Sequence, residues 1–168
     1  MIDKERLAQK CSTWNIDLTP TQLDLLDRYA ALLVDYNRKV NLTAITAPEG
    51  IEDRHFADSL LFAAQPEVAG RLVDVGTGAG FPGLPLRILE PTIRLTLLDS
   101  LGKRVSWLEQ ACTALGAQDV KCLHARAEEQ ALLPGFRDCF DLAAARAVAP
   151  LALLCELCLP FVAGGGVF

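Results

Sequence analysis

The pattern of hydrophobic and polar positions along the chain changes near residue 65. Between Leu23 and Leu33, apolar residues recur every three or four positions, which is the period of an amphipathic helix. The segment Thr19-Pro20-Thr21-Gln22 stands just before this stripe and forms a capping box with proline at the first helical position. A second helical segment begins near Pro48 and runs to Ala64. We therefore expect a helical extension over residues 1–65.

From residue 66 onward, short apolar runs alternate with helical patterns. The expected strands are 71–75, 93–98, 120–123 and 140–144. The expected helices are 83–89, 103–115 and 149–161. This alternation predicts an α/β domain over residues 66–168, with a parallel, Rossmann-like sheet, helices on both faces and ligands at the carboxyl ends of the strands.

The composition narrows the classes of protein that fit. Hydrophobic residues make up 51% and charged residues 22% of the 168 positions, which argues against a disordered chain. The formal net charge is -5, so the protein does not coat nucleic acid by charge alone. Any contact with nucleic acid must therefore be local.

The chain shows no pattern typical of export, membrane insertion or metal binding. Its start is charged and no apolar stretch follows, which predicts a cytoplasmic protein. The apolar part after Leu142 is interrupted by Arg146 and Pro150, well short of a membrane span. The six cysteines should stay reduced in that compartment. The pair Cys155 and Cys158 has C-x-x-C spacing but no second pair and no nearby histidine, so we expect core cysteines and no metal site.

Two glycine motifs overlap between Leu72 and Gly83. Read from Gly76, the acidic strand end at Asp74 is followed by G-x-G-x-G, which suits a nucleoside that carries an amino acid. Read from Gly78, the segment is G-x-G-x-x-G, the dinucleotide fingerprint. A carboxylate at Asp74 repels a pyrophosphate but attracts the α-ammonium group of S-adenosylmethionine. The first register predicts an S-adenosylmethionine site that includes Asp74, Gly76 and Gly78, and the second predicts an NAD-linked oxidoreductase.

Acidic residues also follow the second and third expected strands. Asp99 closes the second strand, where a carboxylate would accept hydrogen bonds from ribose hydroxyls in either register. Glu128 follows the third strand, where it or the backbone of Ala127 would meet the edge of an adenine. A solvated helix start, at which acids favour the dipole, explains Glu128 and Glu129 equally well.

Motifs in five segments stand in the order and at the spacing of one bacterial family. They are Asn41-Leu42-Thr43, Arg54-His55-x-x-Asp58-Ser59, Asp74 to Gly83, Leu97 to Arg104, and Arg126 to Glu129. Together they resemble the ribosomal RNA small subunit methyltransferase G family, also called glucose-inhibited division protein B, over nearly the whole chain. The run Asp99 to Arg104 is far more specific than a glycine motif, and it favours the Gly76 register.

The resemblance implies a Rossmann-like class I methyltransferase that uses S-adenosylmethionine to methylate N7 of a guanine in the decoding-region loop of 16S rRNA. The RNA partner is the 16S rRNA itself or the 30S subunit. Carried over residue by residue, the resemblance implies cofactor contacts at Gly76, Phe81, Ala127, Glu128 and Arg146, with Asp99 as the ribose acceptor. It also implies further strands after a glycine-rich turn at Gly164–Gly166, so we expect C-terminal strands of the sheet to be missing.

Methyl transfer to guanine N7 needs no general base or covalent nucleophile, because N7 already carries a lone pair. Alignment of the reacting atoms and exclusion of water are then the main requirements. Arg146 follows the fourth strand, where its guanidinium would donate to guanine O6 and leave N7 free. A structural ion pair with a neighbouring acid is the alternative for this arginine.

Four basic residues stand at element ends that would surround the same edge of the sheet. We expect Arg54, His55, Lys103 and Arg104 to contact the RNA around an unpaired target base. The alternatives are a solvated helix face for Lys103 and Arg104, an i,i+4 pair between Arg54 and Asp58, and a partly buried His55. A catalytically silent adenosyl-binding module or ribosome-assembly factor is a third class of function that the sequence leaves open.

Overall fold

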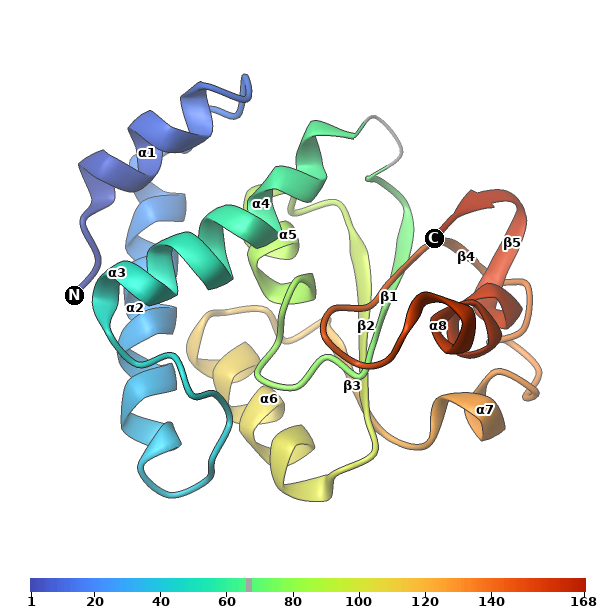
Figure 1. Ribbon diagram of the computed structural model, residues 1–168. Coiled ribbons are helices and arrows are strands. Elements are labelled where there is room, and N and C mark those ends of the chain that lie inside the picture. The colour runs from blue at the N-terminus through green and yellow to red at the C-terminus, as the bar shows by residue number, and fades with distance from the viewer. Residues whose placement is uncertain (66–67) are drawn as a thin grey trace.

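The computed structural model describes residues 1–65 and 68–168, in which helices cover both faces of one parallel sheet (Figure 1). The strands are β1 (Arg71–Val75), β2 (Arg94–Asp99), β3 (Lys121–His124), β4 (Phe140–Ala144) and β5 (Val162–Val167). The α-helices are α1 (Lys4–Ser12), α2 (Pro20–Asn37), α3 (Pro48–Ile51), α4 (Asp58–Leu61), α5 (Gly83–Leu89), α6 (Gly102–Ala114), α7 (Ala127–Gln130) and α8 (Leu151–Cys158). The strand order β3-β2-β1-β4-β5 confirms the expected Rossmann-like arrangement.

Helix α2 begins at the predicted capping box. The backbone amide of Gln22 donates to Thr19 Oγ1 over 3.2 Å, and the amide of Thr19 donates to Gln22 Oε1 over 2.8 Å. Gln22 Nε2 also donates to the carbonyl of Leu89, over 2.8 Å, at the end of α5. The same few atoms therefore start α2 and attach it to a helix of the α/β part.

The segment expected to be helical from Pro48 to Ala64 is a continuous helical run with a π-helical turn in its middle. Helix α3 is followed by π-helix at Glu52–Ala57, by α4 and by a 3₁₀ turn at Phe62–Ala64. Glu52 in the π turn is buried and accepts hydrogen bonds from Asp3 N and Arg6 Nε, both over 2.8 Å. The helix was predicted, whereas the π turn was not.

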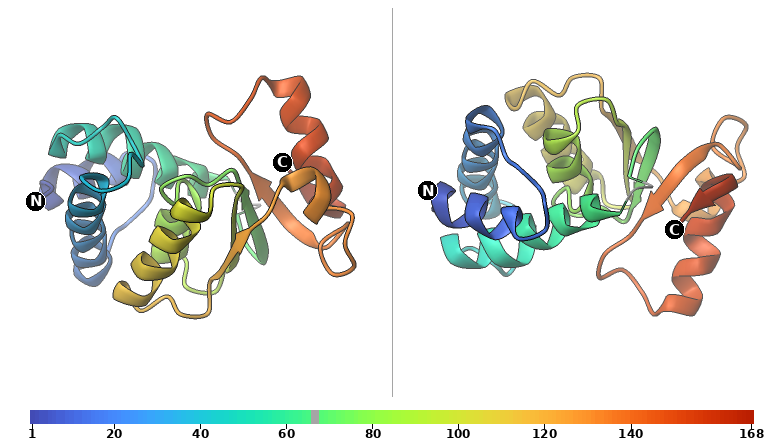
Figure 2. Two further views of the ribbon diagram at one scale, coloured as in Figure 1. Left: turned by 90° about the horizontal axis from the view of Figure 1, so that it is seen from below. Right: turned by 90° about the horizontal axis from the view of Figure 1, so that it is seen from above.

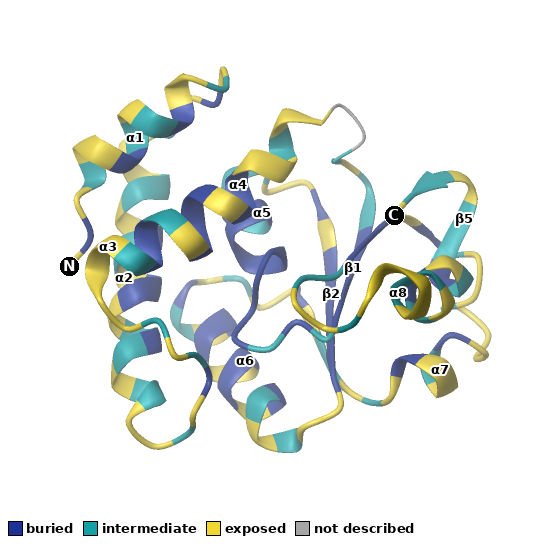
Figure 3. Cartoon of the chain, in the orientation of Figure 1, coloured by how far each residue is buried: buried dark blue, intermediate teal, exposed yellow. Residues whose placement is uncertain are grey.

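Two hydrophobic clusters lie on opposite faces of the sheet. One cluster joins α1, α2, the 48–64 run, α5 and α6 to side chains such as Leu72 and Leu97. The other joins α7 and α8 to Val73, Val75 and Leu98. The two views in Figure 2 show α7 and α8 on the far side of the sheet from the other helices, and Figure 3 shows β1 and β2 buried between them. Such strands read as nearly continuous apolar runs because both of their faces are covered.

The predicted division into an extension over 1–65 and a methyltransferase core over 66–168 stays a prediction. Its boundary falls at residue 66, which lies outside the described residues. The helices before this boundary share a hydrophobic cluster with the sheet after it. The extension therefore packs as an outer layer on α5 and α6.

The glycine-rich segment near the end of the chain is a strand, and the expectation of a turn at Gly164–Gly166 was wrong. Strand β5 pairs in parallel with β4, opposite Phe140 at Val162 and opposite Leu142 at Val167, with a shift of register between these pairs. A Cβ atom at Gly166 would stand 2.7 Å from the carbonyl oxygen of Asp141. Close backbone approach therefore suits glycine here, and pairing with β4 outweighs its low strand propensity.

Candidate functional site

The loop between β1 and α5 is held at both ends by one buried carboxylate. Asp74 Oδ2 accepts hydrogen bonds from Thr77 Oγ1 over 2.7 Å and from the amide of Gly83 over 2.8 Å. The other oxygen, Oδ1, is buried and has no hydrogen-bond partner in residues 1–65 and 68–168. Burial raises the pKa of Asp74 to about 6, against the hydrogen bonds from Thr77 and Gly83. Asp74 thus shapes the loop and leaves one oxygen for a further donor.

The first two glycines of the loop have left-handed backbone conformations but different surroundings. At Gly76, with φ 67°, a Cβ atom would stand 2.6 Å from Val148 Cγ2. At Gly78, with φ 62°, a Cβ atom would find nothing closer than a backbone oxygen at 4.0 Å. Val148 therefore lies close to the loop at Gly76, whereas Gly78 faces open space that a ligand can use.

The tip of the loop is fixed from the opposite side by two buried aromatic side chains. The carbonyl oxygen of Ala79 accepts hydrogen bonds from the Tyr29 hydroxyl over 2.6 Å and from Trp107 Nε1 over 3.0 Å. Neither residue is among those predicted from the sequence. Tyr29 lies three positions after Leu26 and four before Leu33, so the helical stripe could have shown its burial. The carbonyl that it binds could not be read from that stripe.

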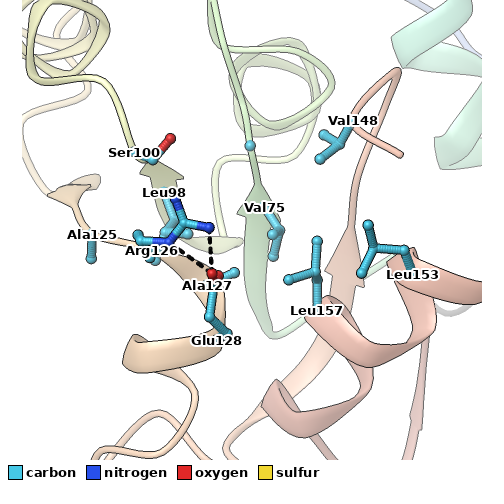
Figure 4. Close-up of a pocket in the computed structure, with 11 residues that line it drawn as sticks. Val75, Leu98, Ser100, Ala125, Arg126, Ala127, Glu128, Val148, Leu153 and Leu157 are labelled. Atoms are coloured by element: carbon cyan, nitrogen blue, oxygen red, sulfur yellow. Dashed lines mark hydrogen bonds and ion pairs between the residues drawn. The ribbon is translucent and has the colours of Figure 1, made fainter. Parts of the chain in front are cut away.

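A first cavity, of about 240 Å³, opens beside the carboxyl ends of β1, β2 and β3, and we call it the apolar cavity. Val75 lies between Leu98 and Ala127 on one side and Leu157 on the other, as Figure 4 shows. Of the predicted cofactor residues, Gly76, Ala127 and Glu128 line it.

At the edge of the apolar cavity, Arg126 and Glu128 form an exposed ion pair. Arg126 Nε donates to Glu128 Oε1 over 2.7 Å (Figure 4). The backbone amide of Glu128 and the guanidinium of Arg126 together lower the pKa of this carboxyl. Glu128 is therefore an anion that lines the apolar cavity. Its partner, Arg126, is exposed at the surface.

A second cavity, of about 170 Å³, lies on the other side of the glycine loop, and we call it the loop cavity. Its lining comes from five separate segments of the chain. The lining residues are Leu42, Thr43, His55, Gly76, Thr77, Gly78, Ala79, Phe81, Arg104, Arg146 and Ala147. Since Gly76 lines both cavities, the two meet at this glycine.

Asp99 lies behind the glycine loop and lines neither cavity. It is buried, and its Oδ2 accepts from the amide of Gly78 over 2.9 Å and from Arg104 Nη1 over 3.4 Å. Its Oδ1 accepts from the amide of Leu101 over 2.9 Å. A carboxylate can accept about four hydrogen bonds, so Asp99 has one acceptor position left.

Arg146 extends from the end of β4 to the helical run and makes several polar contacts there. Its Nη1 pairs with Asp58 Oδ2 over 2.6 Å and donates to the carbonyl of Arg54 over 3.0 Å. The guanidinium carbon lies 5.2 Å from the centroid of the Phe81 ring. The expected ion pair of Arg146 with a neighbouring acid is therefore present. The alternative of an i,i+4 pair between Arg54 and Asp58 was wrong, because Asp58 turns to Arg146 instead.

His55 is buried between this arginine and the loop after α2. Its ring stacks on Phe81 with centroids 4.3 Å apart and 5° between the planes. Its Nε2 lies 2.9 Å from Thr43 Oγ1, and its Nδ1 lies 3.1 Å from Arg146 Nη2. Burial, and then the charge of Arg146, lowers the pKa of His55 to about 4. The imidazole is neutral at physiological pH.

The remaining two basic residues of the predicted RNA set lie outside the loop cavity. Lys103 is exposed in the first turn of α6, and Arg54 is exposed in the π turn. Arg54 lines a separate hollow of about 450 Å³ with Ala44, Ile45, Thr46, Ala47, Glu49, Gly50 and Asp53. The structure thus brings His55 and Arg104 together at the loop cavity and places Arg54 and Lys103 on the surface.

Residues 1–65 and 68–168 contain no helix that is long and apolar enough to cross a membrane. Among these same residues, no group of three or more His, Cys, Asp or Glu side chains is arranged to hold a metal ion.

A parallel sheet in the order β3-β2-β1-β4-β5, with a glycine loop after β1 and an acid at the end of β2, defines the class of Rossmann-like folds, whose ligands bind at the carboxyl ends of the strands. The family model for rRNA small subunit methyltransferase G matches residues 22–168. The chain is 44% identical over 167 residues to the ribosomal RNA small subunit methyltransferase G of Alkaliphilus oremlandii, which covers 98% of this chain and 70% of that relative. The chain belongs to the rRNA small subunit methyltransferase G family.

Two further relatives give the same result. The ribosomal RNA small subunit methyltransferase G of Moorella thermoacetica is 44% identical over 169 residues, which is 99% of this chain and 70% of the relative. That of Clostridium botulinum is 44% identical over 164 residues, which is 96% of this chain and 69% of the relative. The family resemblance predicted from the motifs is therefore confirmed.

Proposed function

We propose that this chain transfers a methyl group from S-adenosylmethionine to N7 of a guanine in the decoding-region loop of 16S rRNA. The observation that carries this proposal is membership of the rRNA small subunit methyltransferase G family over nearly the whole chain, with 44% identity over 98% of its length. The arrangement of two cavities that meet at Gly76 supports it, because methyl transfer needs a donor site and an acceptor site on either side of one reacting centre.

The residues around Gly76 fit the methyl donor, S-adenosylmethionine. The apolar cavity suits an adenine between Leu98 and Leu157, with the backbone of Ala127 and the carboxylate of Glu128 at its polar edge. The remaining acceptor position of Asp99 suits a ribose hydroxyl. S-adenosylmethionine supplies a methyl group on a positively charged sulfur, which makes that methyl strongly electrophilic.

The methionine end of the donor fits the loop side of Gly76. Gly78 leaves open space next to the loop, and Phe81 forms part of the wall of the loop cavity. The unpartnered Oδ1 of Asp74 is the acceptor that this region offers to an α-ammonium group, directly or through a water molecule. The dinucleotide register gives this carboxylate no such role.

The acceptor side requires positioning more than acid–base chemistry. Guanine N7 is a lone-pair nucleophile, so this chain needs only to align it with the methyl group and to exclude water. Arg146 is the side chain best placed to donate to guanine O6, since it lies in the wall of the loop cavity. Because the deep A-form groove hides N7, the target base must be unpaired.

Surface contacts to RNA in this proposal come from Arg54, Lys103 and Arg104. Arg54 and Lys103 are exposed, and Arg104 lines the loop cavity. The chain carries a net charge of -5, so these cations must act as a local site. His55 is too deeply buried for a phosphate contact, and its part in the site is argued below.

Calorimetry and methyl transfer test the proposal. The chain should bind S-adenosylmethionine and not NAD, and mass mapping should find N7-methylguanine in 16S rRNA offered naked, as an assembly intermediate or as the 30S subunit. Gly76→Val should abolish cofactor binding, because its side chain occupies the point where the cavities meet. Gly164→Ala is the matched control in open space.

Each other outcome points to a different class of protein. Binding of NAD alone would mean an oxidoreductase. Binding of S-adenosylmethionine with no methyl transfer to any of the three RNA forms would mean a non-catalytic adenosyl-binding module.

A further inference from the structure

The guanidinium of Arg146 is held in one orientation by groups from the helical run. Its Nη1 contacts Asp58 Oδ2 at 2.6 Å, the carbonyl of Arg54 at 3.0 Å and Ser59 Oγ at 3.5 Å. Its Nη2 contacts His55 Nδ1 at 3.1 Å. Partners on both terminal nitrogens fix the rotation of the planar group as well as its position.

The contact between Arg146 and His55 determines where the imidazole proton lies. An arginine has only donors, so His55 Nδ1 must be the acceptor and must carry no proton. The proton is then on Nε2, which donates to Thr43 Oγ1 over 2.9 Å. Thr43 Oγ1 also accepts from the amide of Ile45 over 3.0 Å, which holds this hydroxyl in place. A chain of directed hydrogen bonds therefore runs from the loop after α2 to Arg146.

This chain of contacts ends at the wall of the loop cavity. Thr43, His55, Phe81 and Arg146 all line that cavity, and the guanidinium lies 5.2 Å from the centroid of the Phe81 ring. The His55 ring stacks on Phe81, so one aromatic surface carries both the imidazole and the cation. His55 and Arg54 lie in the π turn, a helix type that is rare and is often found at functional sites.

We propose that Thr43, His55 and Asp58 are positioning residues, which aim the guanidinium of Arg146 at the base in the loop cavity. His55 acts as a neutral hydrogen-bond acceptor and not as a cation for RNA phosphate. The inference rests on the proposed function, because it assumes that a base enters the loop cavity. It adds that the orientation of Arg146 is supplied by the helical extension, which lies outside the Rossmann-like part of the chain.

Two substitutions at His55 separate positioning from packing. His55→Phe keeps a ring on Phe81 but removes the acceptor for Arg146. His55→Asn loses the ring but places an amide oxygen near the position of Nδ1. If His55 positions Arg146, single-turnover methyl transfer at saturating S-adenosylmethionine should fall by about tenfold or more in His55→Phe, because a hydrogen bond to a charged group is lost. His55→Asn should recover part of that rate even if its thermal midpoint is lower.

A rate that follows the thermal midpoint in both variants would overturn the inference. So would wild-type methyl transfer by folded His55→Phe. Thr43→Val should reduce the rate less than His55→Phe, since it acts one hydrogen bond further away.

Nitrogen-15 NMR of the histidine rings gives a readout that does not depend on activity. We expect an unprotonated Nδ1 and a protonated Nε2 for His55 at neutral pH, and separate Nη resonances for Arg146 that merge in His55→Phe. A protonated Nδ1 would overturn the inference even if the protein is active. A wild-type chain that binds no S-adenosylmethionine would instead count against the proposed function, and the NMR result would still decide whether His55 accepts from Arg146.

Discussion

Two glycine-rich segments of the molecule use glycine for different reasons. In the loop from Gly76 to Gly83, a Cβ atom at Gly83 would stand 2.8 Å from Asp74 Oδ2, and one at Gly80 would meet Leu84 Cδ1 at 2.7 Å and collide with the Tyr29 hydroxyl. In strand β5, a Cβ atom at Gly164 or Gly165 would meet nothing within 4 Å. Similar compositions therefore have very different tolerance to change.

The difference follows from what each segment holds together. The loop is attached to α2, α6 and the buried Asp74, and it lies between the two cavities. Strand β5 is attached to the sheet mainly through its pairing with β4, which the backbone of any residue except proline can provide. Neighbouring atoms require glycine at three of the four loop positions, Gly76, Gly80 and Gly83, whereas in β5 they require it only at Gly166.

Among substitutions of glycine by alanine, the one at Gly80 should have the largest effect on stability. Gly80→Ala should lower the free energy of unfolding by about 3 kcal/mol or more, because backbone strain at φ 108° adds to overpacking against Leu84 and Tyr29. Urea denaturation followed by circular dichroism measures it. Gly116→Ala is the control, since Gly116 has φ 74° but nothing within 4 Å of its Cβ position. Equal losses at the two positions would mean that the packing around Gly80 is not a constraint.

A second prediction concerns the titratable anchor of the loop, which β5 lacks. Burial raises the pKa of Asp74 to about 6, so its contribution to stability is lost as pH rises from about 4 through 6. The pKa of His55 is lowered to about 4, so its contribution is lost as pH falls from about 6.5 through 4. Arg146 faces both groups, Asp58 also faces His55, and Asp99 also faces Asp74. The two contributions oppose each other over the same range.

Asp74→Asn removes one of these opposing contributions. Between pH 6.5 and 4, the free energy of unfolding of the variant should fall relative to that of the wild type by on the order of 2 kcal/mol. Urea denaturation at several pH values in this range provides the measurement. Parallel pH profiles for the two proteins would show that the Asp74 carboxyl titrates normally in the fold.

A smaller effect is expected from the hydroxyl that fixes the tip of the loop. Tyr29→Phe removes a buried hydrogen bond to Ala79 and should cost about 1 kcal/mol. Amide hydrogen exchange should become faster in residues 76–83 and stay unchanged in 162–167. Tyr36→Phe is the matched control, because its hydroxyl only accepts a hydrogen bond of 3.3 Å from Gln110 at the surface. Faster exchange in both segments would mean that Tyr29 acts on the whole fold and not on the loop.

The smallest effect is expected in β5. Gly164→Ala should raise the free energy of unfolding by about 0.5 kcal/mol, because alanine restricts the unfolded chain and meets no neighbour in the folded one. Thermal denaturation is sensitive enough to detect such a change. A clear loss of stability would contradict the contrast between the two segments.

The same contrast explains what the sequence could predict. The bounds of β1 and α5 were predicted correctly, because an apolar run ended by a glycine loop shows both the strand and the turn. Strand β5 was not predicted, because three adjacent glycines give no strand pattern and only pairing with β4 defines it. The local sequence determines β1 and α5, whereas β5 is determined by its tertiary contact with β4.

Within the site, the sequence identified residue types better than their partners. The motifs singled out Asp74, Asp99 and Arg146 at strand ends, and the structure places them around one loop. The ion pair between Asp58 and Arg146 joins residues 88 positions apart, so no local pattern shows it. The π turn that carries His55 also lacks a signature, because helical periodicity does not separate its hydrogen-bond pattern from that of an α-helix.

The two donors on the Ala79 carbonyl have a consequence for how this sequence can evolve. Loss of either Tyr29 or Trp107 as a donor leaves the oxygen with one hydrogen bond, whereas loss of both leaves a buried acceptor with none. The cost of the second substitution therefore exceeds that of the first, so the two positions are epistatic. A substitution at one of them therefore constrains the other, even though they lie in different helices, α2 and α6.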